Sequence, residues 1–319
     1  MGAIAMVVIH AIWSKTLQYI SISLALYTVD LLMRLILGYI MDAKLISVEY
    51  IKNCNIVKLV INKRGFKYKA GQWVYLTIST LGWTDAQPYT IASYSEDPES
   101  QNTVTIFVKN MAGPKEVVGG RWSERLAMWA QKIENKQASI NDAIVRMEGP
   151  YGEVGHDYAE YDTIVLVAGG VGITAMYSLF KSIVEGHRCS EPCCSMKKVY
   201  LVWVKKSNSM WNMLPELLKY ENIENKTYME DKRHCEIQLY VTEDVYGSDF
   251  AAVNGSQVFQ GRPNFKQLLS DIATERNNRV NDNSRYISVC ACGPDAMVNQ
   301  VQSACWWGNS KTTRFHFHK

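Results

Sequence analysis

The sequence predicts an α+β multidomain fold, in which a membrane helix precedes an antiparallel β-barrel and then an α/β domain with a parallel sheet. An apolar run covers residues 17–40, and short alternating β-type segments fill most of residues 42–151. A buried strand, a glycine-rich turn and an amphipathic helix follow from residue 161. We therefore expect a membrane segment over residues 1–41, a barrel over 42–155 and an α/β domain over 156–319.

The composition excludes several classes of protein. With 319 residues, 47% hydrophobic and 20% charged, the chain is long enough for two or three compact units and is not mainly disordered. A net charge of +3 without a clustered basic face argues against nucleic acid as a partner. The eight cysteines lack the dense spacing of a secreted disulfide scaffold, which favours a reducing compartment. Cys189, Cys193 and Cys194 lack a paired second half at zinc-finger spacing, so we expect a surface loop there.

Residues 17–40 form an apolar run of about 24 residues, or about 36 Å of helix, which suffices for a hydrocarbon core of about 30 Å. The run is too long for a cleaved signal peptide and lacks an A-x-A-like site, while a soluble core helix is the weaker alternative. Asp30 and Arg34 lie four residues apart and can pair or reach the interface. Basic residues follow the run, whereas only Lys15 precedes it, so we expect a lipid bilayer as partner and the larger C-terminal part in the cytoplasm.

His10 is the only ionisable residue of the apolar stretch 1–13, which is too short to cross a membrane by itself. A histidine at membrane depth can ligate haem iron through a neutral imidazole, or it can lie at the interface. The residues alone favour the interfacial interpretation.

The barrel prediction comes from the segments LISVEYI, NIVKLVI, QWVYLTIS, TVTIFVK and AIVRME, which RG, AG and DPES turn signals interrupt. Within this part, QPYTIAS resembles the HPFTIAS flavin motif of ferric reductases and NADPH oxidases. A flavin needs an aromatic ring and nearby hydrogen-bond donors. The resemblance implies FAD contacts from the following residues: Gln87, which replaces the usual histidine, Pro88, Tyr89, Thr90 and Ser93.

Residues 119–126, GGRWSERL, are similar to the GGWT-x-x-L segment of the same family. The resemblance implies that Gly120, Trp122 and Ser123 contact the FAD pyrophosphate at a helix start, although Ser123 is also an ordinary N-cap candidate. Lys109 ends the TVTIFVK segment, either as a basic group near the cofactor phosphates or as an exposed strand lysine. EGPYG at 148–152 resembles the turn that links barrel and nucleotide domain in that family.

A βαβ unit is predicted by the run DTIVLVAGGVGITAMYSLFKSIV and the later strand KVYLVWV. The residues of the turn, Gly169, Gly170, Gly172 and Thr174, let a pyrophosphate approach helix amides, or simply shape a tight strand-to-helix connection. Their placement resembles the GxGxTP-type motif of the ferredoxin-NADP reductase superfamily, with Ala175 at the proline position.

Three further segments complete the nucleotide prediction. Lys205 and Lys206 end the second strand, where a ribose 2′-phosphate would lie, and favour NADPH over NADH. GRPN resembles a family segment whose arginine, here Arg262, approaches a nucleotide phosphate, with a surface arginine as the alternative. Cys292, Gly293 and Pro294 resemble the CGP motif beside the nicotinamide, so we assign Cys292 to the hydride-transfer path, whereas Cys290 packs.

These motifs follow the family order over residues 42–310, so the resemblance implies electron transfer from NADPH through FAD to a membrane haem and then to ferric iron. A superoxide-generating NADPH oxidase, with oxygen as acceptor, shares every motif. A non-catalytic, membrane-tethered nucleotide-binding partner is a second alternative, motivated by Gln87 and Ala175. The resemblance makes His10 a haem-ligand remnant, with haem expected only alongside further membrane helices. It also implies a terminal aromatic over the flavin, either Phe315 or Phe317, unless the terminus is missing.

Overall fold

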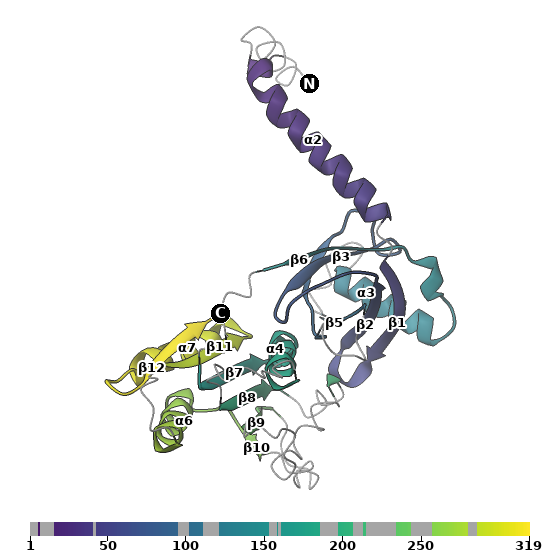
Figure 1. Cartoon of the computed structure of the whole chain (residues 1–319). Helices are drawn as coiled ribbons and strands as arrows, with labels where there is room; N and C mark the ends of the chain where they lie inside the picture. The colour runs from purple at the N-terminus through teal and green to yellow at the C-terminus, as the bar shows by residue number, and fades with distance from the viewer. Residues whose placement is uncertain are drawn as a thin grey trace.

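The described part of the chain contains two six-stranded sheets, a long N-terminal helix and four shorter helices that pack on the sheets (Figure 1). The computed structural model describes residues 6, 16–40, 43–94, 102–110, 121–152, 158, 161–185, 197–206, 213–214, 234–243, 257–279 and 286–319. Strand pairs are antiparallel in the first sheet and parallel in the second, which confirms the predicted order of the two domains.

Helix α2 spans Thr16–Ile40, one residue longer than predicted, and projects away from the first sheet (Figure 1). Side chains are described for residues 20–33, and all of them are exposed, including Leu24, Val29 and Met33. Over the described residues, no helix is both long enough and apolar enough to cross a membrane. The Arg34 side chain and the whole of His10 lie outside the described part of the chain.

The first sheet closes into a barrel. Its strands are β1 (Ala43–Ile51), β2 (Ile56–Lys63), β3 (Trp73–Ile78), β4 (Gln87–Thr90), β5 (Thr103–Lys109) and β6 (Val145–Tyr151), in the order β4-β3-β6-β1-β2-β5. The two edge strands contact each other, and just after β4 the Ala92 amide donates to the Thr105 carbonyl of β5 at 2.9 Å. Alternate residues of β2 point inward, and α3 (Trp122–Glu134) packs its buried face on β1 and β2.

The EGPYG prediction needs a correction. Glu148–Tyr151 is the end of strand β6, where Glu148 pairs with Tyr75 and Tyr151 with Trp73 of β3. The segment therefore extends the barrel and is not itself the turn to the next domain, because its backbone pairs with strand β3.

The second sheet contains β7 (Thr163–Gly169), β8 (Lys198–Lys205), β9 (His234–Val241), β10 (Gln257–Gln260), β11 (Tyr286–Cys292) and β12 (Arg314–His318). Its order is β10-β9-β8-β7-β11-β12, and β7, α4 (Ile173–Glu185) and β8 form the predicted βαβ unit. Strands β7 to β10 proceed in one direction, and β11 then returns to the other side of β7. The topological switch point therefore lies between β7 and β11, where open parallel sheets bind ligands at their carboxyl ends.

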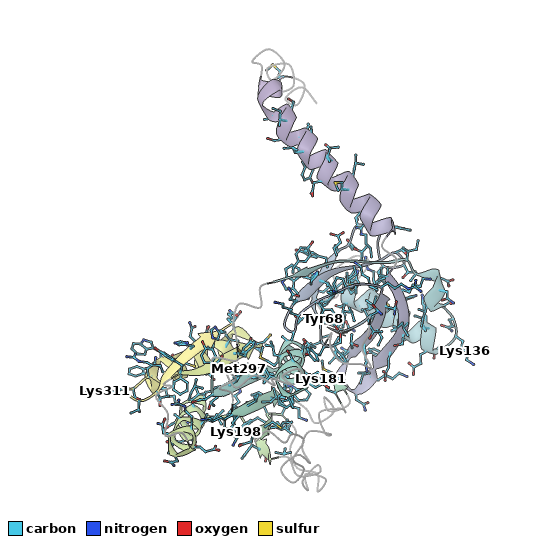
Figure 2. All side chains as sticks on the ribbon, viewed as in Figure 1. Tyr68, Lys136, Lys181, Lys198, Met297 and Lys311 are labelled. Atoms are coloured by element: carbon cyan, nitrogen blue, oxygen red, sulfur yellow. The ribbon has the colours of Figure 1, made fainter. Side chains whose placement is uncertain are left out.

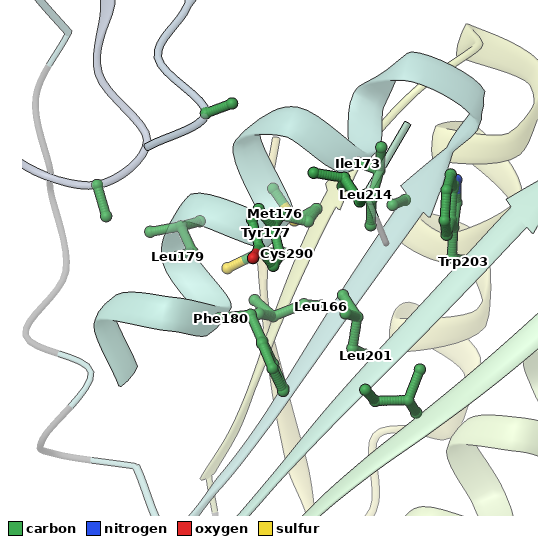
Figure 3. Close-up of a cluster of buried hydrophobic side chains, with 14 of the residues drawn as sticks. Leu166, Ile173, Met176, Tyr177, Leu179, Phe180, Leu201, Trp203, Leu214 and Cys290 are labelled. Carbon is green, nitrogen blue, oxygen red and sulfur yellow. The ribbon is translucent and has the colours of Figure 1, made fainter. Parts of the chain in front are cut away.

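The two faces of this sheet have different partners. One face forms a core that contains Leu166, Ala168 and Trp203 of the sheet and Phe180 of α4, and Ala92 and Phe107 of the barrel join it. Figure 3 shows Leu166, Phe180 and Trp203 of this core. The opposite face packs against α6 (Phe265–Arg279) and α7 (Asp295–Gly308). The barrel therefore contacts the α4 face of the nucleotide domain.

The C-terminal aromatic residues lie on the face away from the barrel. Phe315 is buried and Phe317 partly buried in the cluster that α6 and α7 form. The expectation that either residue covers the flavin is therefore wrong for this structure, since strand β12 directs both toward α6 and α7.

The nucleotide domain contains a buried ion pair. Arg276 of α6 donates three hydrogen bonds, of 2.6, 3.0 and 3.1 Å, to the carboxylate of Asp162, which precedes β7. Both side chains are nearly inaccessible, at 3% and 2% exposure. Removing one partner would leave an uncompensated charge in the core.

We predict that Asp162→Ala destabilises the nucleotide domain by about 3–5 kcal/mol, because Arg276 keeps its buried charge. Urea unfolding followed by tryptophan fluorescence measures the effect. The matched control, Lys52→Ala, breaks the exposed Lys52–Glu134 pair and should change stability by less than about 1 kcal/mol. Equal effects of the two substitutions would contradict the prediction.

Candidate functional site

At the carboxyl edge of the second sheet, the glycine turn after β7 touches the end of β11. A Cβ on Gly172 would lie 2.3 Å from the Cys292 carbonyl oxygen, and one on Gly169 would lie 2.6 Å from Cδ of Pro294. A Cβ on Gly293 would lie 2.8 Å from the Gly169 Cα. These three glycines are therefore required by the packing of one turn on the other.

Gly170 has a different environment. Its φ of +55° is in the left-handed region, and an added Cβ would meet no atom within 4 Å. Its carbonyl accepts a hydrogen bond of 3.0 Å from the indole N–H of Trp203, which fixes the turn. Gly170 thus leaves open space at the switch point, where a phosphate could approach.

The first turn of α4 follows this open space. Thr174 is buried, and its hydroxyl donates to the Val171 carbonyl at 3.0 Å, so part of its hydrogen-bonding capacity is used inside the turn. The positive end of the dipole of α4, a helix of 13 residues, faces the glycine turn. This arrangement suits a pyrophosphate group.

Cys292 lies on the side of the sheet that faces the barrel. Cys290 and Cys292 both border the α4 core, as strand alternation predicts, and Figure 3 shows Cys290 among the side chains of that core. Cys290 is 4% exposed, whereas Cys292 is only partly buried. Burial raises the pKa of the Cys292 thiol, so the group is a small neutral thiol at neutral pH.

The two predicted lysines lie in different places. Lys206 is exposed and forms an ion pair of 2.8 Å with Glu243, while Arg262 is also exposed and follows Gly261, whose φ is +92°. Lys205 is 1% exposed, and its ammonium lies 5.5 Å from the centroid of the Trp203 ring. Burial raises the pKa of the Cys54 thiol in the barrel, and the positive charge of Lys205 lowers it by a smaller amount. Of this pair, Lys206 is the one accessible to a ligand.

In the barrel, the flavin-like segment 87–93 begins with the edge strand β4. The Tyr89 ring lies 5.5 Å from the Trp122 ring at an interplanar angle of 35°, and burial raises the pKa of the Tyr89 phenol. Gln87 and Thr90 are half-buried and Pro88 is exposed. The strand thus offers an aromatic surface and polar groups of the kind that an isoalloxazine ring needs.

Ser93 has its polar atoms engaged by the protein. Its hydroxyl lies 2.6 Å from the Tyr68 hydroxyl, labelled in Figure 2, and accepts from the Thr105 amide at 3.1 Å. Its carbonyl accepts from the hydroxyl of Ser178 in α4 at 2.9 Å. Ser93 therefore joins the flavin-like segment to the nucleotide domain.

The remaining predicted barrel contacts are Lys109, Gly120, Trp122 and Ser123, of which the last two belong to α3. This helix begins at Trp122, so Ser123 is inside the first turn and the N-cap alternative is wrong. Arg121 occupies the cap position, and its amide donates to the Glu124 carboxylate at 3.1 Å. Lys109 is exposed at the end of β5, and Gly120 lies outside the described residues.

Three residues of the site were not identified from the sequence: Trp203, Ser178 and Met297. Trp203 belongs to a strand that resembles ordinary core, and Met297 of α7, labelled in Figure 2, would lie 3.0 Å from a Cβ on Gly169. Their roles come from contacts between segments distant in sequence, so no local pattern indicates them.

No group of three or more potential metal ligands occurs among the residues that the structure describes. Cys189, Cys193 and Cys194 lie outside those residues, as does His10.

Both sheets lie within segments that match models of known domain families. Residues 40–155 match the family described as FAD-binding domain, and residues 161–306 match the ferric reductase NAD binding domain. These two domains bind FAD and NAD(P), so the cofactor prediction from the sequence is confirmed.

The chain is 26% identical to human dual oxidase 1 over 281 residues, which covers 80% of this chain and 16% of that protein. It is 24% identical to human NADPH oxidase 4 over 325 residues, covering 97% of this chain and 52% of that protein. The chain thus spans about half the length of NADPH oxidase 4 and a smaller part of dual oxidase 1.

The fold is also found in a ferredoxin NADP+ reductase from Neisseria gonorrhoeae with bound FAD and NADP. That structure has a TM-score of 0.53 and 12% identity, covering 86% of this chain and 96% of its own. A ferredoxin-NADP+ reductase from Plasmodium falciparum has the same TM-score of 0.53 at 14% identity, with coverage of 87% and 96%. At these identities the likeness concerns the fold.

We predict that Gly172→Ala destabilises the nucleotide domain by about 1–3 kcal/mol and weakens NADP+ binding, because its Cβ would overlap the Cys292 backbone. Gly170→Ala should cost about 1 kcal/mol, since it meets only conformational strain. Thermal unfolding and calorimetric titration with NADP+ measure both effects. A smaller loss of stability for Gly172→Ala than for Gly170→Ala would contradict the direct contact between the glycine turn and the end of β11.

Proposed function

Because the chain belongs to the ferric reductase and NADPH oxidase family of flavoprotein oxidoreductases, we propose that it passes electrons from NADPH through FAD to a membrane haem and then to ferric iron. FAD accepts a hydride and releases single electrons, which is the chemistry that links a nicotinamide to haem. The protein contributes binding, orientation and exclusion of water.

The position of Cys292 is the observation that carries this proposal. Its neutral thiol borders the switch point on the face that packs against the barrel, the domain that carries Tyr89 and Thr90. A nicotinamide beside Cys292 would therefore face the flavin domain. Hydride transfer needs no general acid or base, which agrees with a site built from glycines, a thiol and aromatic side chains.

We assign the cofactor contacts within this arrangement. Tyr89, Thr90 and Pro88 would hold the isoalloxazine side of FAD, with Gln87 as an uncharged hydrogen-bonding neighbour. Gly120, Trp122, Ser123 and Lys109 would lie toward its pyrophosphate. For NADPH we assign Gly170 and Thr174 to the pyrophosphate, Lys206 and Arg262 to the 2′-phosphate, and Cys292, Gly293 and Pro294 to the nicotinamide.

For helix α2 we propose a membrane anchor. Its described side chains are exposed and mostly apolar around the whole helix, as a hydrocarbon environment requires. The following basic residues support a cytoplasmic position for both nucleotide-binding domains. Haem ligation by His10 needs a partner histidine on another membrane helix.

A superoxide-generating NADPH oxidase is the second candidate. The relatives described above are oxidases by name, which favours oxygen as the final acceptor. The two candidates share every step before the haem. Parallel assays of Fe(III)-chelate reduction and superoxide formation on membranes containing the protein with its haem helices distinguish them.

A non-catalytic, membrane-tethered nucleotide-binding partner is the third candidate, favoured by Gln87 and Ala175 at two motif positions. It predicts a purified protein that shows no NADPH-dependent flavin reduction.

We predict that the purified chain with FAD shows a flavin absorption band at about 450 nm, and that NADPH decreases this absorption under anaerobic conditions. Cys292→Trp should abolish the bleaching, because an indole would obstruct the nicotinamide. The matched control is Tyr286→Trp, which places the same side chain at the exposed start of the same strand. Full bleaching in Cys292→Trp would contradict the placement of the nicotinamide, and none in the wild type would contradict the proposed function.

We also predict that Arg262→Ala raises the KM for NADPH about ten- to a hundredfold and leaves the KM for NADH unchanged, since only NADPH carries the 2′-phosphate. Steady-state reduction of an artificial electron acceptor with both coenzymes measures the effect. Arg314→Ala, which removes an exposed arginine at the start of β12, is the control. A loss of affinity that is equal for NADPH and NADH would contradict the assignment of Arg262.

A further inference from the structure

We propose that Ser178 is a positioning residue that sets the distance between nicotinamide and flavin through its hydrogen bond to Ser93. This inference rests on the proposed transfer of a hydride from NADPH to FAD. Neither serine needs to contact the reacting atoms for this role.

The bond crosses from one domain to the other. Ser178 is 0% exposed on α4, and its hydroxyl donates to the Ser93 carbonyl at 2.9 Å. Ser93 is 8% exposed in the barrel, 85 positions earlier in the sequence. A buried hydroxyl without this acceptor would lose a bond that water does not readily replace.

Each end of the bond is attached to a cofactor motif. Ser178 is five residues after Ile173, where α4 begins, so it lies about 7.5 Å along the helix axis from the glycine turn. Ser93 is three residues after Thr90, the last residue of strand β4 with its flavin-like segment. A shift of one serine therefore shifts the adjoining motif.

The barrel side of the joint is held in place. The Ser93 hydroxyl is fixed between the Tyr68 hydroxyl and the Thr105 amide, at 2.6 and 3.1 Å. The Thr105 carbonyl also accepts from the Ala92 amide at 2.9 Å, which closes the barrel at this position. Ser93 is thus part of the barrel framework.

The nucleotide side is equally close-packed. Leu179, the residue after Ser178, lies against Gly71 of the barrel, where an added Cβ would come within 3.4 Å of the leucine Cδ2. Figure 3 shows Leu179, Met176 and Tyr177 on the same helix within the shared core. Apolar packing holds the domains together, and the hydrogen bond adds a constraint on both distance and direction.

Hydride transfer is sensitive to this geometry. Reacting atoms must approach to about 3–3.5 Å, and a misplacement of about 1 Å can cost on the order of a hundredfold in rate. The Ser178–Ser93 bond supplies a directional, polar constraint between the two motifs in addition to the apolar contacts.

The test measures anaerobic flavin reduction by stopped flow with the full chain, loaded with FAD, at saturating NADPH and at saturating NADPH deuterated at the transferred position. For Ser178→Ala we expect a reduction rate lowered by about tenfold and an increased deuterium isotope effect. The FAD content and the dissociation constant for NADP+ should change by less than about threefold, because no cofactor contact is removed.

Two variants keep the test informative if Ser178→Ala folds poorly. Ser178→Cys replaces only the hydroxyl, by a larger thiol with a weak S–H donor, so we expect a reduced rate. Ser178→Thr retains the hydroxyl and adds one methyl group, so its rate should exceed those of Ser178→Ala and Ser178→Cys. The matched control is Ser288→Ala, which removes another 0% exposed hydroxyl of the same domain, one that lies 3.9 Å from the Cys290 thiol.

A wild-type rate and isotope effect in both Ser178→Ala and Ser178→Cys would overturn the proposal, as would an equal loss in Ser288→Ala. Absence of flavin reduction in the wild-type protein is a different result, which overturns the proposed function and with it this inference.

Discussion

The nucleotide domain depends on one contact, the direct meeting of two backbones at the ends of β7 and β11. Gly172 faces the Cys292 carbonyl, and Gly169 faces Gly293 and Pro294, so that no side chain fits between the two turns. Parallel pairing of Cys292 with Ala168 brings the turns to the same edge of the sheet. Because protein interiors are close-packed, this contact fixes the switch point, and open space remains beside Gly170.

The same contact directs Cys292 toward the flavin domain. Residues of β11 alternate between the two faces, and the CGP turn ends the strand with Cys292 on the α4 side. The barrel packs on that side, through Ala92, Phe107 and the Ser178–Ser93 bond. Cys292 therefore borders the same core that the barrel residues Ala92 and Phe107 join.

Several residues of the cofactor motifs make contacts within the protein. Ser93 joins the two domains through its bond to Ser178. Lys205 is buried, whereas the next residue, Lys206, is exposed. Gly169 and Gly172 allow the two backbones to touch. A sequence motif records that a residue type is required, but it does not say whether a ligand or another segment requires it. Both requirements act on glycine and serine in the same way, through close approach and through hydrogen bonding.

The sequence by itself determined the order of the two sheet domains, the two sheet types and the binding of FAD and NAD(P). Period-two runs such as TVTIFVK and the all-apolar run of β7 are local signals, and β5 begins and ends where predicted. The strands β9, β10 and β12, the extension of β6 through Tyr151 and the placement of Phe315 were decided only by the tertiary structure. The joint through Ser178 was decided there too. The physical reason is that pairing, burial and domain contact depend on partners far away in the chain, so identical local patterns can end in a core, at an edge or between domains.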